Sequence, residues 1–92
     1  MKILVINPNT TASMTKKIAL AARAVARPDT EILATNSKKG PASIQGFLDV
    51  ANCLTGLLEE VKLYRDVDAI VIACFDDTGL DAVRSMVSVP VL

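Results

Sequence analysis

The stretch that decides the fold is VDAIVIACFDDTGLDA, at positions 67–82 of the 92-residue sequence. Its five consecutive apolar residues, 69–73, are typical of a β-strand that is buried on both faces, as strands of parallel sheets are. The apolar run stops at Cys74, and an acidic pair then leads into a helical pattern. We therefore expect residues 67–73 to form the central strand of a parallel sheet.

The segments before and after this stretch alternate between strand and helix patterns. Short apolar runs bounded by turn residues predict strands, whereas apolar residues three or four positions apart predict helices. Thr78 and Asp81 have the spacing of a capping box at the start of the last helix. The expected elements are strand 2–6, helix 11–26, strand 30–36, helix 43–65, strand 67–73, helix 79–87 and the opening of a fourth strand at 89–92.

This order of elements predicts an α/β fold with three layers. We expect a mostly parallel four-stranded sheet with helices on both faces and a ligand site at the carboxyl ends of the strands. Ninety-two residues fit one small domain, so residues 1–92 are expected to form a single lobe. A fourth strand without a following helix would leave apolar surface uncovered. We therefore expect either a longer protein or a partner chain to supply the cover, and self-association into a homo-oligomer.

Composition excludes several classes of function. Ten Lys plus Arg balance ten Asp plus Glu, which argues against nucleic acid or an anionic membrane as a partner. Histidine is absent, and the two cysteines have no CxxC spacing, so we expect no metal site, no disulfide framework and a cytoplasmic protein. Neither GxGxxG nor GxxxxGK[ST] occurs, so no nucleotide cofactor is predicted, and no apolar run is long enough to cross a membrane.

Cys74 is the reactive side chain that this fold places at its ligand edge, just before a helix. Thiols at helix N-termini have their pKa lowered from ~8.5, which favours the thiolate, whereas the neighbouring Asp76 and Asp77 would oppose it. The alternative interpretation is a small buried hydrophobic residue. Cys53 stands within an apolar helical pattern and is interpreted as a packing residue.

The segment NPNTT, residues 7–11, follows the first expected strand and should lie at the same edge as Cys74. Its amides, hydroxyls and free helix N–H groups have the chemistry to bind a carboxylate, an imide oxygen or a phosphate. The alternative is a polar turn that only begins a helix. The residues alone leave both interpretations open.

Three separated motifs, MKILVINPNTT, GPASIQGF and VDAIVIACFDDTGLDA, resemble the hydantoin and allantoin racemases of the aspartate/glutamate racemase superfamily. The motifs occur in the same order, and the resemblance runs over the whole chain. It implies a small-molecule carbon acid as substrate, such as a 5-substituted hydantoin or allantoin, and no cofactor. It also implies two similar α/β halves, with one acid/base cysteine on each face of the substrate.

The resemblance carries over to individual residues. Cys74, in the segment ACFDD, matches the first of the two catalytic cysteines. Asn7, Asn9 and Thr10 match the substrate-binding turn, and the backbone amides of Phe75 and Asp76 are further expected ligand contacts. Members of the family are longer, and their second cysteine lies in the second half, so this chain resembles the N-terminal half of a racemase.

Two other functions are alternatives to a racemase. A receiver-like binding module has the same order of elements, but it needs acidic residues after the first strand and an Asp at the end of the third. This sequence has Asn7, Asn9 and Cys74 at those places. An inactive truncated fragment is the remaining alternative.

Overall fold

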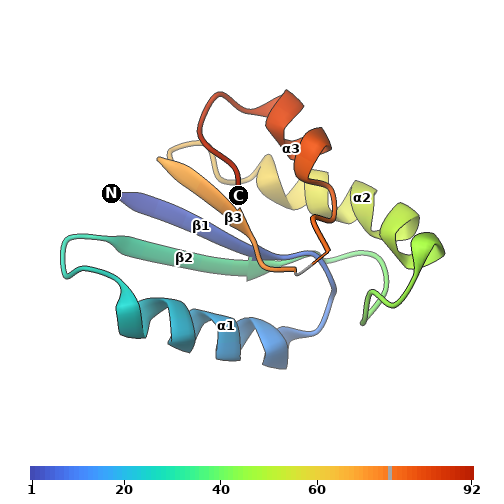
Figure 1. Cartoon of the computed structure of the whole chain (residues 1–92), viewed down its shortest axis with the longest axis horizontal. Coiled ribbons are helices and arrows are strands. Elements are labelled where there is room, and N and C mark those ends of the chain that lie inside the picture. Colours follow the sequence, from blue (N-terminus) through green and yellow to red (C-terminus); the bar gives the residue numbers. More distant parts are fainter. Residues whose placement is uncertain (75) are drawn as a thin grey trace.

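The computed structural model describes residues 1–74 and 76–92, and it contains three parallel strands with helices on both sides of the sheet (Figure 1). Helix α1 lies over one face, and helices α2 and α3 lie over the other. The α/β class, the parallel strands and the three-layer arrangement are therefore confirmed. The elements are β1 (Lys2–Asn7), α1 (Ala12–Val25), β2 (Glu31–Asn36), α2 (Phe47–Val61), β3 (Ala69–Ile72) and α3 (Leu80–Met86).

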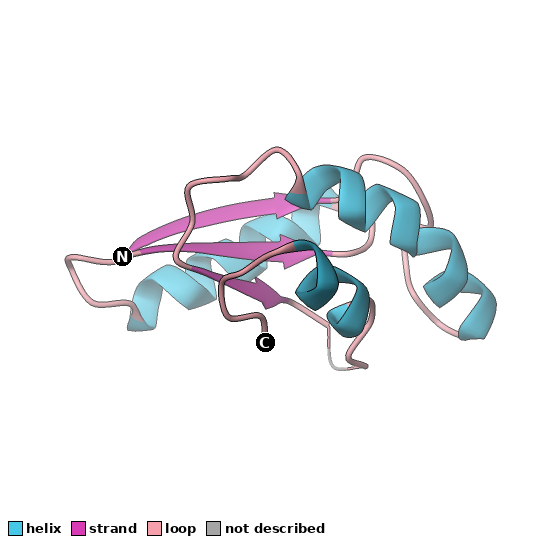
Figure 2. Ribbon diagram, turned by 90° about the horizontal axis from the view of Figure 1, so that it is seen from above, coloured by secondary structure: helices cyan, strands magenta, loops and turns pink. Residues whose placement is uncertain are grey.

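The sheet has the order β2-β1-β3, so the prediction that residues 67–73 form the central strand is wrong. Strand β1 pairs on both sides, with Leu4 opposite Leu33 of β2 and Ile70 of β3. Both β1 and β3 are apolar runs of similar quality, and the sequence pattern does not distinguish the middle strand from its neighbour. All three arrows run the same way, which brings their carboxyl ends to one edge (Figure 2).

The predicted fourth strand is reduced to a single parallel bridge between Val91 and Ile70. Three backbone hydrogen bonds hold this segment beside β3: Ile70 N–H to Pro90 O at 2.9 Å, Leu92 N–H to Ile70 O at 3.0 Å and Ile72 N–H to Leu92 O at 2.8 Å. Proline has no N–H to donate, so pairing does not extend toward residue 89. The four-stranded sheet expected from the sequence is corrected to three strands plus this bridge.

The second helix is shorter than the predicted range of 43–65. Gly46, its N-cap residue, is fully extended, and the helix ends at Val61. The helix continues through Gly56 without a break. The absence of a side chain at Gly56 allows a loop to approach the helix closely. A Cβ atom at Gly56 would lie 2.3 Å from the backbone oxygen of Lys39.

The capping box expected at the last helix is also wrong. The N-cap residue of α3 is Gly79, whose φ of 70° lies in the left-handed region, and no side chain caps the helix. The hydroxyl of Thr78 instead donates to Asp76 O at 3.3 Å. A Cβ atom at Gly79 would lie 2.5 Å from Leu57 Cδ2, so glycine permits both the turn and its contact with α2.

The hydrophobic core lies between the sheet and the two helices on its α2 and α3 side. Alternate residues of the strands point into it, as the two-residue period of a strand requires. Its members are Leu4, Ile6, Leu57, Val61, Val67, Ile70, Ile72, Val83 and Val91.

A buried carboxylate fastens the loop after β2 to helix α2. Glu60 is only 3% exposed, and it accepts a 2.6 Å hydrogen bond from Thr35 Oγ1. The ammonium group of Lys38 lies 3.2 Å from the same carboxylate oxygen. A buried acid that is bonded in this way aligns the helix with the strand and with the following loop.

Replacing Glu60 with alanine should lower the free energy of unfolding by roughly 1.5 to 2 kcal/mol, because the Thr35 hydroxyl would stay buried without a partner. Glu59→Ala is the matched control. Glu59 is half exposed and pairs with the more exposed Lys39, so its loss should cost less than about 0.5 kcal/mol. Urea unfolding of both variants measures the difference. Equal stability of the two variants would contradict the structural role of Glu60.

The sheet face under α1 carries an apolar groove of about 810 Å³. Helix α1 packs mainly on β2 and β1, and the groove is lined by Val71 of β3 and by Ala73, which directly follows β3. The expected self-association stays a prediction, and sedimentation velocity would test it.

Among the described residues, none of the three helices has both the length and the apolar character of a membrane span.

Candidate active site

The carboxyl edge of the sheet collects polar residues from all three strands. Strand β1 ends at Asn7 opposite Asn36, the last residue of β2. Beyond β3, the amide of Ala73 donates to Ile6 O at 2.8 Å, and Cys74 follows. The structure thus places the NPNTT turn and Cys74 at one edge, as expected.

The thiol of Cys74 is half-buried, unpaired with any other sulfur, and packed against the hydrophobic core. Its Sγ lies 3.4 Å from Thr78 Oγ1, and the Thr78 side chain is almost fully buried. The carboxylates of Asp76 and Asp77 are exposed, so water screens their effect on the sulfur. The site therefore offers a partly accessible thiol whose hydrogen-bonding partner is a hydroxyl.

The two asparagines of the NPNTT turn are buried and bonded within the turn. Asn7 Nδ2 donates to Asn9 Oδ1 at 2.8 Å, and the Asn9 backbone N–H donates back to Asn7 Oδ1 at 3.2 Å. Asn9 Oδ1 also accepts the backbone N–H of Thr11 at 2.9 Å. Through these bonds the two side chains hold the backbone of the turn in its conformation, as expected for a polar turn.

The motif GPASIQGF meets this turn. The backbone N–H of Thr10, which is half-buried, donates to Pro41 O at 3.1 Å. The hydroxyl of Thr11 donates to Ala42 O at 2.6 Å. Two motifs that lie some thirty residues apart are therefore joined at the same edge.

Two further members of this cluster, Thr15 and Asn36, were missed by the sequence analysis. Thr15 Oγ1 donates to Asn36 Oδ1 at 2.9 Å and accepts from Asn7 Nδ2 at 3.3 Å. Asn36 ends its strand as Asn7 ends the neighbouring one, and that repeated position was the available signal. Phe75 lies outside the described residues, and the side chain of Asp76 is exposed.

Cys53 is fully buried within α2, and its thiol donates to Val50 O at 3.1 Å. Burial raises the pKa of the Cys53 thiol, and the nearby Cys74 raises it further. Cys53 remains a neutral packing residue at physiological pH, in agreement with its interpretation from the sequence.

Replacing Cys53 with alanine should cost roughly 1 kcal/mol of stability at neutral pH, because a buried side chain is lost. The raised pKa adds a pH dependence to this cost. A thiol that ionises less readily in the folded state stabilises the fold below the unfolded pKa, near 9.0, and the advantage fades as the pH rises further. The free energies of unfolding of the wild-type protein and of Cys53→Ala should thus converge above pH 9. A gap that is constant from pH 7 to 10 would contradict this prediction.

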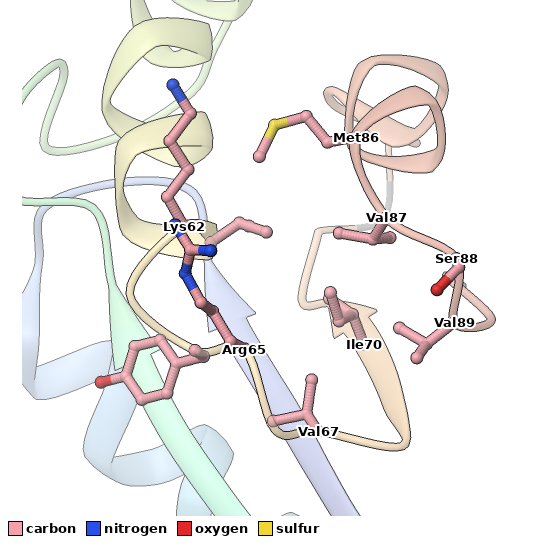
Figure 3. Close-up of a pocket in the computed structure, with 10 residues that line it drawn as sticks. Lys62, Arg65, Val67, Ile70, Met86, Val87, Ser88 and Val89 are labelled. Atoms are coloured by element: carbon pink, nitrogen blue, oxygen red, sulfur yellow. The ribbon is translucent and has the colours of Figure 1, made fainter.

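A separate pocket of about 450 Å³ lies at the other end of β3, between the C-terminal ends of α2 and α3 (Figure 3). Lys62 and Arg65 stand on one side, and Met86, Val87 and Ile70 on the other. Cys74 and the NPNTT turn do not line it. Within the described residues, no three His, Cys, Asp or Glu side chains gather to hold a metal ion.

A family model described as Asp/Glu/hydantoin racemase matches residues 3–92. The chain is 50% identical to a hydantoin racemase of Pseudomonas sp. (strain NS671), over 100% of this chain and 38% of the relative. It is 45% identical to a hydantoin racemase of Paenarthrobacter aurescens, again over the whole chain and over 40% of the relative.

Solved structures give the same picture. The allantoin racemase from Klebsiella pneumoniae superposes with a TM-score of 0.94 at 48% identity, covering 99% of this chain and 38% of the other. The allantoin racemase from Pseudomonas fluorescens also gives 0.94, at 36% identity, over 100% of this chain and 40% of the other. The chain spans about two fifths of the length of the relatives that it matches.

Proposed function

Because the chain belongs to the Asp/Glu/hydantoin racemase family, we propose that it is a lobe of a cofactor-independent racemase acting on a hydantoin-like carbon acid. A 5-substituted hydantoin or allantoin is the proposed substrate. The observation that carries the proposal is Cys74, a free and partly accessible thiol at the carboxyl edge of the sheet, in a chain 50% identical to a hydantoin racemase.

Cys74 is proposed to act as one of two acid/base cysteines. As a thiolate, it takes the proton from the stereocentre, and the electron pair of the C–H bond passes to the adjacent carbonyl oxygen. A thiol on the opposite face then returns a proton to the carbon, which inverts it. Backbone N–H donors that face the developing oxyanion would stabilise this intermediate.

Cys53 is a poor choice for the second thiol. It is fully buried, its S–H is bonded to a helix carbonyl, and burial raises its pKa. We therefore place the second acid/base thiol in the part of the family's length that this chain does not match.

The proposed substrate contacts lie in the turn after β1 and in the loop after Cys74. Asn7 and Asn9 would act by shaping the turn, since their side chains are buried and bonded within it. Thr10 is half-buried, and its hydroxyl is proposed to contact the ligand. The backbone amides of Phe75 and Asp76 complete the proposed set.

A small-molecule substrate and a homo-oligomer are proposed, with neither nucleic acid nor membrane as a partner, because the net charge is zero. A reducing, cytoplasmic setting suits the two free thiols.

A chimera tests the function directly. Residues 1–92 would replace the matched region of the Pseudomonas hydantoin racemase, and the loss of optical rotation of an enantiopure 5-substituted hydantoin would be followed. We expect racemisation well above the rate in buffer alone. A chimera that folds, as judged by circular dichroism, but does not exceed the buffer rate would contradict the proposal.

A further inference from the structure

The hydroxyl of Thr78 has two partners and only one hydrogen. Its oxygen lies 3.4 Å from Cys74 Sγ and 3.3 Å from Asp76 O, and the side chain is 2% exposed. A carbonyl oxygen can only accept a hydrogen bond, whereas a thiol can donate or accept one. The direction of the Thr78–Cys74 bond therefore depends on whether the sulfur carries a proton.

Each protonation state of Cys74 has a satisfied arrangement. When Cys74 is a thiol, its S–H can donate to Thr78 Oγ1, and the threonine hydrogen points at Asp76 O. When Cys74 is a thiolate, the threonine hydrogen can turn to the sulfur, which then accepts a charge-assisted bond. Only rotation about the threonine Cβ–Oγ1 bond is needed, so the heavy atoms stay in place.

We propose that Thr78 is a positioning residue that supports both the thiol and the thiolate of Cys74 by turning its hydroxyl. This inference rests on the proposed function, since an acid/base cysteine must pass through both states in every turnover. A hydroxyl suits that cycle better than a lysine, which would stabilise only the thiolate. It also suits it better than a carboxylate, which would stabilise only the thiol.

The fold holds Thr78 in this position. Gly79, directly after it, adopts a φ of 70°, and a side chain there would collide with Leu57 of α2. Asp77, directly before it, also has a positive φ, of 35°. A turn with left-handed residues on both sides of Thr78 directs this side chain inward and leaves the neighbouring carboxylates outside.

Other titratable groups around the sulfur include Cys53, Asp76 and Asp77. Helix α2 carries Cys53, whose pKa is raised by burial and by Cys74, and the exposed carboxylates of Asp76 and Asp77 lie near Cys74 in sequence. The aspartates are unchanged in variants of Thr78, and Cys53 can be removed. A change in thiol reactivity on substituting Thr78 then reports the hydroxyl itself.

The experiment measures the rate of Cys74 alkylation by iodoacetamide against pH, in the 92-residue chain carrying Cys53→Ala. Intact mass follows the reaction, since Cys74 is then the sole thiol. Thr78→Val keeps the shape but lacks the hydroxyl, Thr78→Ala removes both, and Thr78→Ser keeps the hydroxyl. A hydrogen bond to a thiolate is about twice as strong as one to a neutral thiol, so losing the hydroxyl disfavours the thiolate more than the thiol, and Val and Ala should slow alkylation at pH 7 by roughly fivefold. Ser should remain within about twofold of the parent.

The outcomes separate the two hypotheses. Alkylation of Thr78→Val at the parent rate, or slowing of Thr78→Ser equal to that of Thr78→Val, would overturn the role of the hydroxyl. An unfolded variant would expose the thiol, and its alkylation rate would approach the rate measured in denaturant. In that case the better folded of Thr78→Val and Thr78→Ala tests the role of the hydroxyl. None of these rates requires racemisation, so an inactive chimera with the expected thiol response would count against the proposed function alone.

Discussion

Cys74→Ser is expected to lower racemisation by the chimera by about 10² to 10⁴ while leaving its fold unchanged. Serine has nearly the same shape as cysteine, but its hydroxyl is too weakly acidic to form the base near neutral pH. The half-buried position and the single hydroxyl partner of the sulfur should accommodate the smaller oxygen without rearrangement. Polarimetry measures the loss, and circular dichroism monitors the fold.

Cys53→Ala is the matched control, because it removes the neighbouring thiol and should leave the rate unchanged. Deuterium exchange at the stereocentre adds a finer test. Exchange from one enantiomer should outlast racemisation in Cys74→Ser, since the proposed second thiol still serves the other face. Near-normal racemisation by Cys74→Ser, or an inactive Cys53→Ala, would show that the acid/base group has been placed wrongly.

Gly56→Ala is expected to destabilise the protein by roughly 2 to 3 kcal/mol. In an isolated helix the same change is favourable by about 1 kcal/mol, since alanine is the better helix former. Here the new methyl group would meet the Lys39 backbone oxygen at 2.3 Å, and a backbone atom cannot move aside cheaply. The sign of the effect thus separates local helix propensity from the close approach of the loop.

Gly46→Ala provides the comparison for this prediction. Gly46 begins the same helix, but no atom lies within 4 Å of its Cβ position, and its extended backbone suits any residue. Its replacement should change the stability by less than about 0.5 kcal/mol. Guanidinium unfolding of the two variants measures both values, and a stabilised Gly56→Ala would disprove the close contact.

The sequence was a good guide to the elements whose pattern is local. Apolar runs and helical spacing located all three strands and all three helices, because burial imposes these periods directly. Order within the sheet is a different matter. Strand β1 and the run before Cys74 are equally apolar, so only tertiary pairing decides that β1 lies in the middle.

In the candidate site, too, the local features could be predicted from the sequence and the tertiary contacts could not. Cys74 and the NPNTT turn could be placed at one edge, because each follows a strand in the sequence. The partner of the sulfur could not be predicted, because the spacing of Thr78 and Asp81 indicates a helix cap. The Thr78 hydroxyl instead donates to Asp76 O and lies near Cys74 Sγ. Likewise, nothing in the spacing of Glu60 from Thr35 indicates a buried bond between α2 and β2.

The middle position of β1 bears on how the chain folds during synthesis. This strand leaves the ribosome before both of its partners, and β3 follows long after it: Lys2 bonds to Asp68, 66 residues away. At roughly 5–20 residues per second, one apolar edge of β1 stays unpaired for several seconds. Such an edge can pair with another nascent chain, so holding chaperones should engage the N-terminal strand until Ala69–Ile72 emerges.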